Sequence, residues 1–155
     1  MSSKIAQRQV VGFVEPETVG GIAPPSFGVQ REGYFAQVSG GEITASVEKV
    51  YDGGSIFPET LCAPPEIGDI TLTRHYDKDR DGRALQLLRP LVGRAYYDVT
   101  VQELDCDLVV YGTQRSYAMA LLVGLSEPEG DSSSGAPTTF SLTFSISSVS
   151  GVTRP

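Results

Sequence analysis

The chain has 155 residues, with 12 Lys and Arg residues against 19 Asp and Glu residues, which gives a formal net charge of −7 at pH 7. Hydrophobic residues make up 40% of the chain and charged residues 20%, an ordinary composition for one globular domain. The negative charge argues against a protein that grips nucleic acid, the absence of any apolar stretch near ~20 residues argues against a membrane anchor, and the single histidine, His75, excludes a catalyst built on several histidines.

The N-terminal residues 1–27 are expected to form an extended arm ahead of the domain, which then spans residues 28–155. Pro16, Pro24 and Pro25 lie in this segment together with the pair Gly20-Gly21. Closely spaced Pro and Gly residues interrupt both helices and strands. The 17 glycines and 10 prolines of the whole chain are spread along it, so long helices are excluded as well.

The segments between these breaks mostly alternate apolar and polar residues with period two, which is the pattern of half-buried β-strands. A stretch rich in Pro and Gly at 52–68 predicts an irregular loop, of a length that is usually functional or disordered. The pair Gly40-Gly41 is expected to turn the chain between the first two strands. Strands are predicted at residues 34–39, 42–51, 70–73, 97–102, 117–125 and 139–149.

The last two of these strands carry the clearest apolar faces. The opposite face of 139–149 is rich in hydroxyl groups, so that strand should bury one side only. In 117–125 the opposite face is also apolar, so both sides of that strand are expected to be covered. The apolar stripes consist of Tyr117, Met119, Leu121, Val123 and Leu125 in the first strand and of Phe140, Leu142, Phe144 and Ile146 in the second.

One segment, 82–92, predicts a short helix. Asp81 suits the N-cap position ahead of it, and Pro90 should end or kink the helix because it removes a donor and restricts the residue before it. The apolar face is expected to consist of Ala84, Leu87, Leu88 and Leu91, at positions i, i+3, i+4 and i+7.

Three aspartates at alternate positions, Asp77, Asp79 and Asp81, precede Gly82 in the way that an EF-hand calcium loop begins. The last position of such a loop should be a bidentate glutamate, but here it is Leu88. Two interpretations stand side by side. One is a charged turn in which Asp81 caps the helix, and it is favoured; the other is a calcium-dependent β-sandwich binding module that uses the three aspartates as metal ligands.

No combination of residues predicts catalysis or a cofactor. His75 has no second ligand or nucleophile at motif spacing, and a surface or packing role suits it better. The acidic residues at 103, 105 and 107 are expected on one face of a strand, as a solvated edge. Cys62 and Cys106 form no metal motif and are interpreted as free thiols. The chain is therefore predicted not to be an enzyme and to use no cofactor.

Four motifs follow one another along the chain: Phe35-Ala-Gln-Val-Ser-Gly40, Glu42-Ile-Thr-Ala-Ser-Val-Glu48, Val50-Tyr-Asp-Gly-Gly54 and Gly68-Asp-Ile-Thr-Leu-Thr-Arg74. This series resembles the tail tube proteins of long-tailed bacteriophages and the related tubes of contractile injection systems. That family has a charged turn, a short helix and further strands after the fourth motif, the order that residues 77–93 and 96–103 follow. The strand at 139–149 is similar to the family's closing strand.

The resemblance implies a mainly β fold, an antiparallel β-sandwich or small barrel with one short flanking α-helix, whose sheets join between subunits into a ring. It implies a structural virion protein, the major tail tube subunit, which polymerises as stacked hexameric rings that form the hollow conduit for ejection of genome DNA. The implied partners are other copies of the chain, the tape measure protein, the tail terminator and the distal tail or baseplate proteins. Double-stranded DNA would pass through the lumen without specific binding. The implied location is the virion tail, and the host cytoplasm during assembly.

The same resemblance assigns roles to particular residues. Residues 10–27 are expected to lie on a neighbouring subunit, and residues 51–67 are expected to form a stacking loop against the next ring. The apolar anchors of that loop are Ile56, Phe57, Pro58 and Leu61. The strand 42–51 is expected in the wall of the lumen, where polar or acidic side chains repel rather than bind phosphate. The lumen candidates are Thr44, Ser46 and Glu48.

Overall fold

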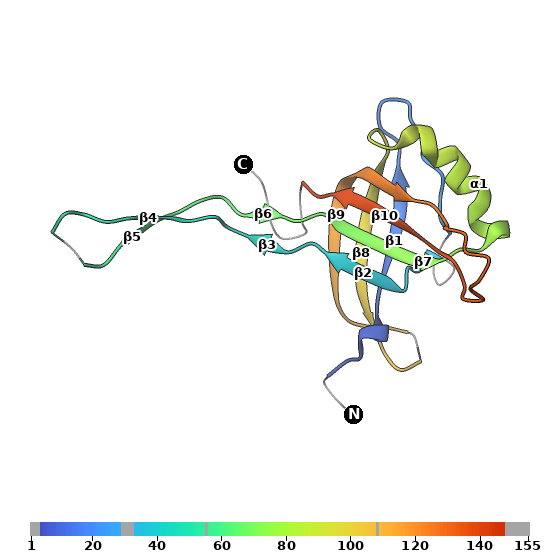
Figure 1. Ribbon diagram of the computed structural model, residues 1–155, viewed down its shortest axis with the longest axis horizontal. Helices are drawn as coiled ribbons and strands as arrows, with labels where there is room; N and C mark the ends of the chain where they lie inside the picture. Colours follow the sequence, from blue (N-terminus) through green and yellow to red (C-terminus); the bar gives the residue numbers. More distant parts are fainter. Residues whose placement is uncertain (1–3, 29–32, 55, 108, 148–155) are drawn as a thin grey trace.

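The computed structural model describes residues 4–28, 33–54, 56–107 and 109–147. Figure 1 shows a rolled sheet with one helix beside it and a long two-stranded arm that projects away from both. The predicted fold class, mainly β with an antiparallel small barrel and one short flanking helix, is confirmed.

Every strand of the barrel is antiparallel to its neighbours, in the order β1-β8-β9-β10-β7-β2. The two edges of the sheet meet, because the Gly12 N–H donates to the Phe35 carbonyl at 3.1 Å and the Phe35 N–H donates back at 2.6 Å. A Cβ on Gly12 would lie 2.8 Å from Leu72 Cδ2, so a glycine is needed at this closure. The strands are β1 (Val10–Glu17), β2 (Gln37–Gly40), β7 (Ile70–His75), β8 (Tyr96–Leu104), β9 (Val110–Ser126) and β10 (Thr139–Ser145).

The strand β1 corrects the domain organisation expected from the sequence. Residues 10–17, placed in an N-terminal arm of 1–27, instead pair along their whole length with β8 of the same chain. Val11 and Val14 are buried in the barrel, and so is Phe27 at the end of the expected arm. Pro16 is compatible with a strand because β1 lies at an edge of the sheet. Burial of these apolar side chains outweighs the local Pro and Gly signals, so the barrel begins at residue 10.

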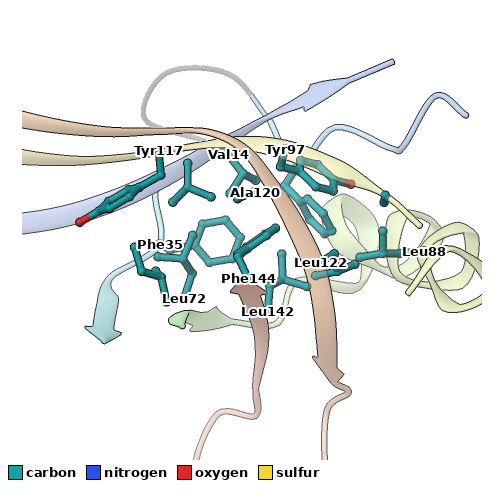
Figure 2. Packing of buried hydrophobic residues seen from close by; sticks show 14 of the residues in the cluster. Val14, Phe35, Leu72, Leu88, Tyr97, Tyr117, Ala120, Leu122, Leu142 and Phe144 are labelled. Atoms are coloured by element: carbon teal, nitrogen blue, oxygen red, sulfur yellow. The ribbon is translucent and has the colours of Figure 1, made fainter. Parts of the chain in front are cut away.

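Aromatic side chains fill the interior of the barrel (Figure 2). Phe35 and Phe140 meet edge to face with ring centroids 5.9 Å apart, and Tyr97 and Phe144 do the same at 5.7 Å. This is a preferred geometry for aromatic pairs. The Tyr97 hydroxyl donates to the Pro25 carbonyl at 2.7 Å, and burial raises the pKa of Tyr97. The segment before β2 is thereby tied to the core.

The faces of β10 are those that the sequence predicts. Phe140, Leu142, Phe144 and Ile146 are buried, and the hydroxyl-bearing residues between them are half-buried. Residues 148 and 149 of the predicted strand lie outside the described residues.

The predicted stripe of β9 is wrong between Met119 and Val123, although Tyr117 and Leu125 do pack on the core. Ala118 and Met119 together oppose Asp98, because the β8–β9 register shifts between Tyr97 and Val99. This β-bulge gives Met119 a φ of 53° and lets its N–H donate to Asp98 Oδ1 at 2.9 Å. One extra residue moves the following side chains to the other face, until a second register shift, in the β9–β10 pair between Leu122 and Gly124, returns Leu125 to the core side. As a result Ala120 and Leu122 are buried, whereas Met119 and Val123 are exposed.

The helix α1 (Lys78–Leu88) begins four residues before the predicted 82–92 segment, and a 3-10 turn, η3 (Arg89–Leu91), follows it. Its N-cap is Asp77, whose Oδ1 accepts the N–H groups of Asp79 at 3.0 Å and Arg80 at 3.3 Å. Asp81 is fully buried instead and forms an ion pair with Arg74 of β7. The sequence pattern could not reveal this long-range partner.

The ion pair also changes which face of α1 packs on the barrel. Arg74 lies over the rings of Phe35 and Phe140, with its Cζ 4.6 and 5.4 Å from the two centroids. Because Asp81 must reach Arg74, the buried helix face consists of Asp81, Ala84, Leu85 and Leu88. Leu87, predicted on the apolar face, is 51% exposed.

Candidate assembly surface

Residues 41–69, here called the arm, form one long hairpin (Figure 1). Near the barrel, β3 (Ile43–Thr44) pairs with β6 (Glu66–Ile67), and farther out β4 (Glu48–Val50) pairs with β5 (Glu59–Leu61). The predicted strand 42–51 and the predicted irregular loop 52–68 are therefore the two halves of the same hairpin. No side chain of these short strands is fully buried, so alternation of hydrophobicity could not mark the second half as strand.

The arm is an extension of the β2–β7 pair of the barrel. The Gly41 N–H donates to the Asp69 carbonyl at 3.2 Å, and the Gly68 N–H donates to the Glu42 carbonyl at 2.8 Å. Gly40 has a φ of 88°, and a Cβ there would lie 1.9 Å from the Asp69 oxygen. Gly40-Gly41 does not turn the chain back between two barrel strands, as expected, but allows it to leave the barrel.

Large apolar side chains on the arm face solvent. At the tip, Ile56 is 86% exposed and Phe57 is 75% exposed. An isolated two-stranded hairpin is marginally stable in water, and grouped apolar side chains on a surface mark interaction sites. The exposed apolar residues of the arm are Ile43, Val47, Val50, Tyr51, Ile56, Phe57 and Leu61.

The arm is also strongly acidic. It carries six carboxylates and a single lysine, Lys49, so most of the net charge of −7 lies on it. The carboxylates belong to Glu42, Glu48, Asp52, Glu59, Glu66 and Asp69, and all of these residues are exposed.

All residues that the sequence singled out for stacking or for the lumen lie on this arm. Ile56, Phe57 and Leu61 are exposed and Pro58 is half-buried, between the tip and β5. Thr44, Ser46 and Glu48 are exposed too, on the first half of the hairpin and not on a strand of the barrel. Four further exposed apolar residues of the arm were not predicted as anchors: Ile43, Val47, Val50 and Tyr51. Their signal is the position of Gly53-Gly54 midway between Gly40 and Gly68, which indicates a hairpin tip.

The three aspartates of the possible calcium loop have other partners. Asp77 caps α1, and Asp81 is held by Arg74 and by Arg80, whose Nη2 lies 3.2 Å from Asp81 Oδ2. Asp79 lies in the first turn of the helix, where a negative charge is favoured. Burial lowers the pKa of Arg74 and outweighs the opposite effect of Asp81. Across the described part of the chain, no group of three or more His, Cys, Asp or Glu residues is placed to hold a metal ion.

The acidic residues at 103, 105 and 107 accept hydrogen bonds from nearby groups or lie in a turn. Glu103 lies on β8 and accepts from the Thr113 N–H at 3.0 Å and the Thr113 hydroxyl at 2.8 Å, which lowers its pKa. Asp105 and Asp107 lie in the turn after β8, not on its face as expected, and Asp105 Oδ1 accepts the Asp107 N–H at 2.9 Å. Asp105 Oδ1 also accepts the Val109 N–H at 2.9 Å, so Asp105 caps the turn.

Three smaller findings complete the account of the surface. His75 is exposed at the end of β7, where its carbonyl accepts from Arg80 Nη2 at 3.3 Å. Cys62 and Cys106 are exposed free thiols, as predicted. Among the helices within the described ranges, none is both long enough and apolar enough to cross a membrane.

No family model matches the chain, and no curated protein matches it in sequence. Solved structures nevertheless share its fold. A chain of the PVC sheath-tube complex, an extracellular contractile injection system in its extended state, has a TM-score of 0.70 at 16% identity, with 95% of this chain and 90% of that chain covered.

Two chains from the anti-feeding prophage are similar as well. One comes from its tube-terminating cap, with a TM-score of 0.68 at 14% identity, covering 96% of this chain and 91% of that chain. The other comes from its baseplate, in a structure symmetrised as sixfold. Its TM-score is 0.67 at 16% identity, with 96% of this chain and 95% of that chain covered. The resemblance to tail tube proteins is thus confirmed at the level of the fold.

Proposed function

We propose that this chain is a structural subunit of a hollow tube, of the kind that contractile injection systems and phage tails contain, and that it catalyses no reaction. The observation that carries the proposal is the arm: a barrel closed on its own core extends a hairpin whose apolar side chains are exposed. A subunit that stacks on others needs such a surface, whereas a free monomer would keep it in water at a cost. The fold shared with chains of sheath-tube, cap and baseplate assemblies supports it.

In this function the subunits join their sheets into hexameric rings, and the rings stack into the major tail tube. The sixfold baseplate among the structures with this fold supports the ring size. Ring closure is a heterologous (head-to-tail) contact whose rotation closes on itself. Stacking is a heterologous contact that does not close and so continues as an open filament. The tube is a virion tail component, assembled in the host cytoplasm with the tape measure protein, the tail terminator and the distal tail or baseplate proteins. Genome DNA passes through it without being bound.

The arm performs the stacking. Ile56, Phe57, Pro58 and Leu61 are its apolar anchors against the next ring. Thr44 and Ser46, close to the barrel, and Glu48, farther out, face the lumen if the arm runs along the channel. The carboxylates of the arm then repel passing phosphate over the ~8 Å that salt leaves unscreened.

Electron microscopy of the purified protein tests the proposal, with and without a tail initiator complex. Rings or tubes with a central channel are the expected result. A variant in which a short Asn-Gly turn replaces residues 43–67 should keep the strand signal of the barrel in circular dichroism and form no stacked tube. Tubes of normal length from that variant, or a chain that stays monomeric with an initiator present, would refute the proposal.

A further inference from the structure

One face of the outer arm combines carboxylates with apolar side chains. The β4–β5 register pairs Glu48 with Leu61 and Val50 with Glu59. Residues opposite one another in a ladder point to the same side, and alternate residues of a strand share that side. These four residues therefore form one face, here called the arm face. Val50 and Leu61 lie diagonally across this face and are each more than 40% exposed, so the face offers a short apolar contact beside two carboxylates.

One face of α1 has the matching composition with the opposite charge. Arg80, Arg83 and Leu87 follow one another at i, i+3 and i+7, the spacing of neighbours on a helix surface. This group is here called the helix face, and all three residues are exposed. Arg80 shares the Asp81 carboxylate with Arg74, so two guanidinium groups oppose one carboxylate and positive charge remains. Leu87 gives this face an apolar end that the barrel does not cover.

The arm face and the helix face lie toward opposite ends of the subunit. The arm ends where β7 begins at Ile70, and α1 begins shortly after β7 ends at His75. Six residues of strand separate the two ends by about 20 Å, and Figure 1 shows the arm and α1 extending from opposite sides of the barrel. Copies arranged in one direction along the long axis therefore bring the arm of one toward α1 of the next, a heterologous contact that leaves a free end for further copies.

We propose that the arm face of one copy docks on the helix face of a second copy. Val50 and Leu61 cover Leu87, Glu59 pairs with Arg83, and Glu48 pairs with Arg80. Apolar burial supplies the attraction, while the opposite charges select the direction of stacking and speed the encounter. This rests on the proposed tube function and adds the receiving surface. It gives Glu48 a role in docking rather than in the lumen.

A charge swap within the chain tests the pairing. Arg83→Glu should raise the protein concentration needed for tube growth at least tenfold, measured by light scattering and microscopy. Arg8→Glu makes the same charge change on an exposed residue of the 3-10 turn η1 (Gln7–Gln9), which Figure 1 shows away from α1, and should leave tube growth unchanged. The double variant Arg83→Glu/Glu59→Arg should restore growth to within threefold of the wild type, because the pair is re-formed with reversed signs. Circular dichroism and thermal melting check that each variant folds.

The outcomes separate this inference from the proposed function. Wild-type protein that forms neither rings nor tubes overturns both. Wild-type tubes together with normal growth of Arg83→Glu overturn the inference alone, and so does an Arg83→Glu defect that Glu59→Arg fails to relieve. A cysteine pair gives a second measurement that needs no loss of growth: Leu61→Cys/Leu87→Cys, with Cys62 and Cys106 replaced by Ser, should form a ladder of disulfide-linked oligomers. Exclusively monomeric chains in assembled tubes after oxidation would contradict the contact.

Discussion

The barrel and the arm contain similar apolar residues in opposite surroundings. In the barrel, Phe140 and Leu142 are enclosed almost completely, whereas on the arm Ile56 and Phe57 are largely in water. The barrel buries its side chains against its own strands, so its apolar residues stabilise the folded chain. The arm has only its own two strands, and its apolar residues contribute little to folding. The apolar residues of the barrel therefore stabilise the monomer, whereas those of the arm are left available for the contact with another copy that we propose.

The sharpest test of this contrast removes one phenylalanine from each region. Phe140→Ala should lower the free energy of unfolding by about 3–5 kcal/mol, because it deletes a buried ring and leaves a cavity. Phe57→Ala should change it by less than about 0.5 kcal/mol, as surface substitutions do, and should weaken tube growth instead. Urea unfolding of the monomer measures the first effect and light scattering the second. Equal destabilisation by both variants would remove the distinction between the regions.

The next effect concerns the ion pair that fixes α1 to the barrel. Asp81→Asn should lower the free energy of unfolding by about 3 kcal/mol, because the Arg74 charge stays buried among aromatic rings without a carboxylate. Asp79→Asn is the matched control on the exposed side of the same turn. It should change the free energy of unfolding by less than about 0.5 kcal/mol, as surface substitutions do. Comparable losses for the two variants would show that the buried pair is not what holds the helix.

A smaller effect is expected at the junction of the two regions. Gly40→Ala should cost about 1–3 kcal/mol, since it forces a side chain into a positive-φ conformation and against the Asp69 carbonyl. Gly53→Ala, at the open tip of the arm, meets no atom within 4 Å and should be nearly neutral. Chemical unfolding followed by tyrosine fluorescence compares them. A neutral Gly40→Ala would mean that the arm leaves the barrel by a different backbone path.

The smallest effect is a pH dependence on the surface of the barrel. The hydrogen bonds from Thr113 hold the pKa of Glu103 below its ordinary value of 4.5. Its contribution to stability is therefore fully present above pH 4.5 and is lost as the pH falls through the lower folded-state pKa. Melting temperatures of wild type and Glu103→Gln, measured from pH 6 to pH 3, should converge at the acid end. A constant difference across this range would contradict the assignment.

Much of the barrel was predictable because its signals are local. The alternation of Phe140, Leu142 and Phe144 with hydroxyl-bearing residues is a period-two pattern, and it predicts the buried face of β10 correctly. The same reasoning failed in β9, because the bulge at Met119 shifts the pattern by one residue and is set by Asp98 on another strand. It also placed the N-cap at Asp81, because local spacing cannot distinguish a capping aspartate from one that reaches a buried arginine.

The candidate site was only partly predictable for a related reason. Ile56, Phe57 and Leu61 were predicted as contact residues because the resemblance to tail tube proteins implies a stacking loop in this Pro- and Gly-rich stretch. The pairing of that stretch with residues 42–51 leaves no trace in hydrophobic periodicity, since neither half has a fully buried face. The proposed receiving surface on α1 depends on which way the helix is rotated, and the buried Asp81 decides that rotation.

The sequence by itself determined the mainly β content, the closing strand, the short helix ending near Pro90 and the presence of unusual apolar residues between Tyr51 and Leu61. Each of these features depends on residues within a few positions of one another, because the spacing of apolar residues predicts a strand or a helix. Only the tertiary structure decided that β1 belongs to the barrel, that the long loop is half of a hairpin, and that the arm and α1 extend from opposite ends of β7. These depend on contacts between residues far apart in the chain, whose free energy exists only once the barrel has closed.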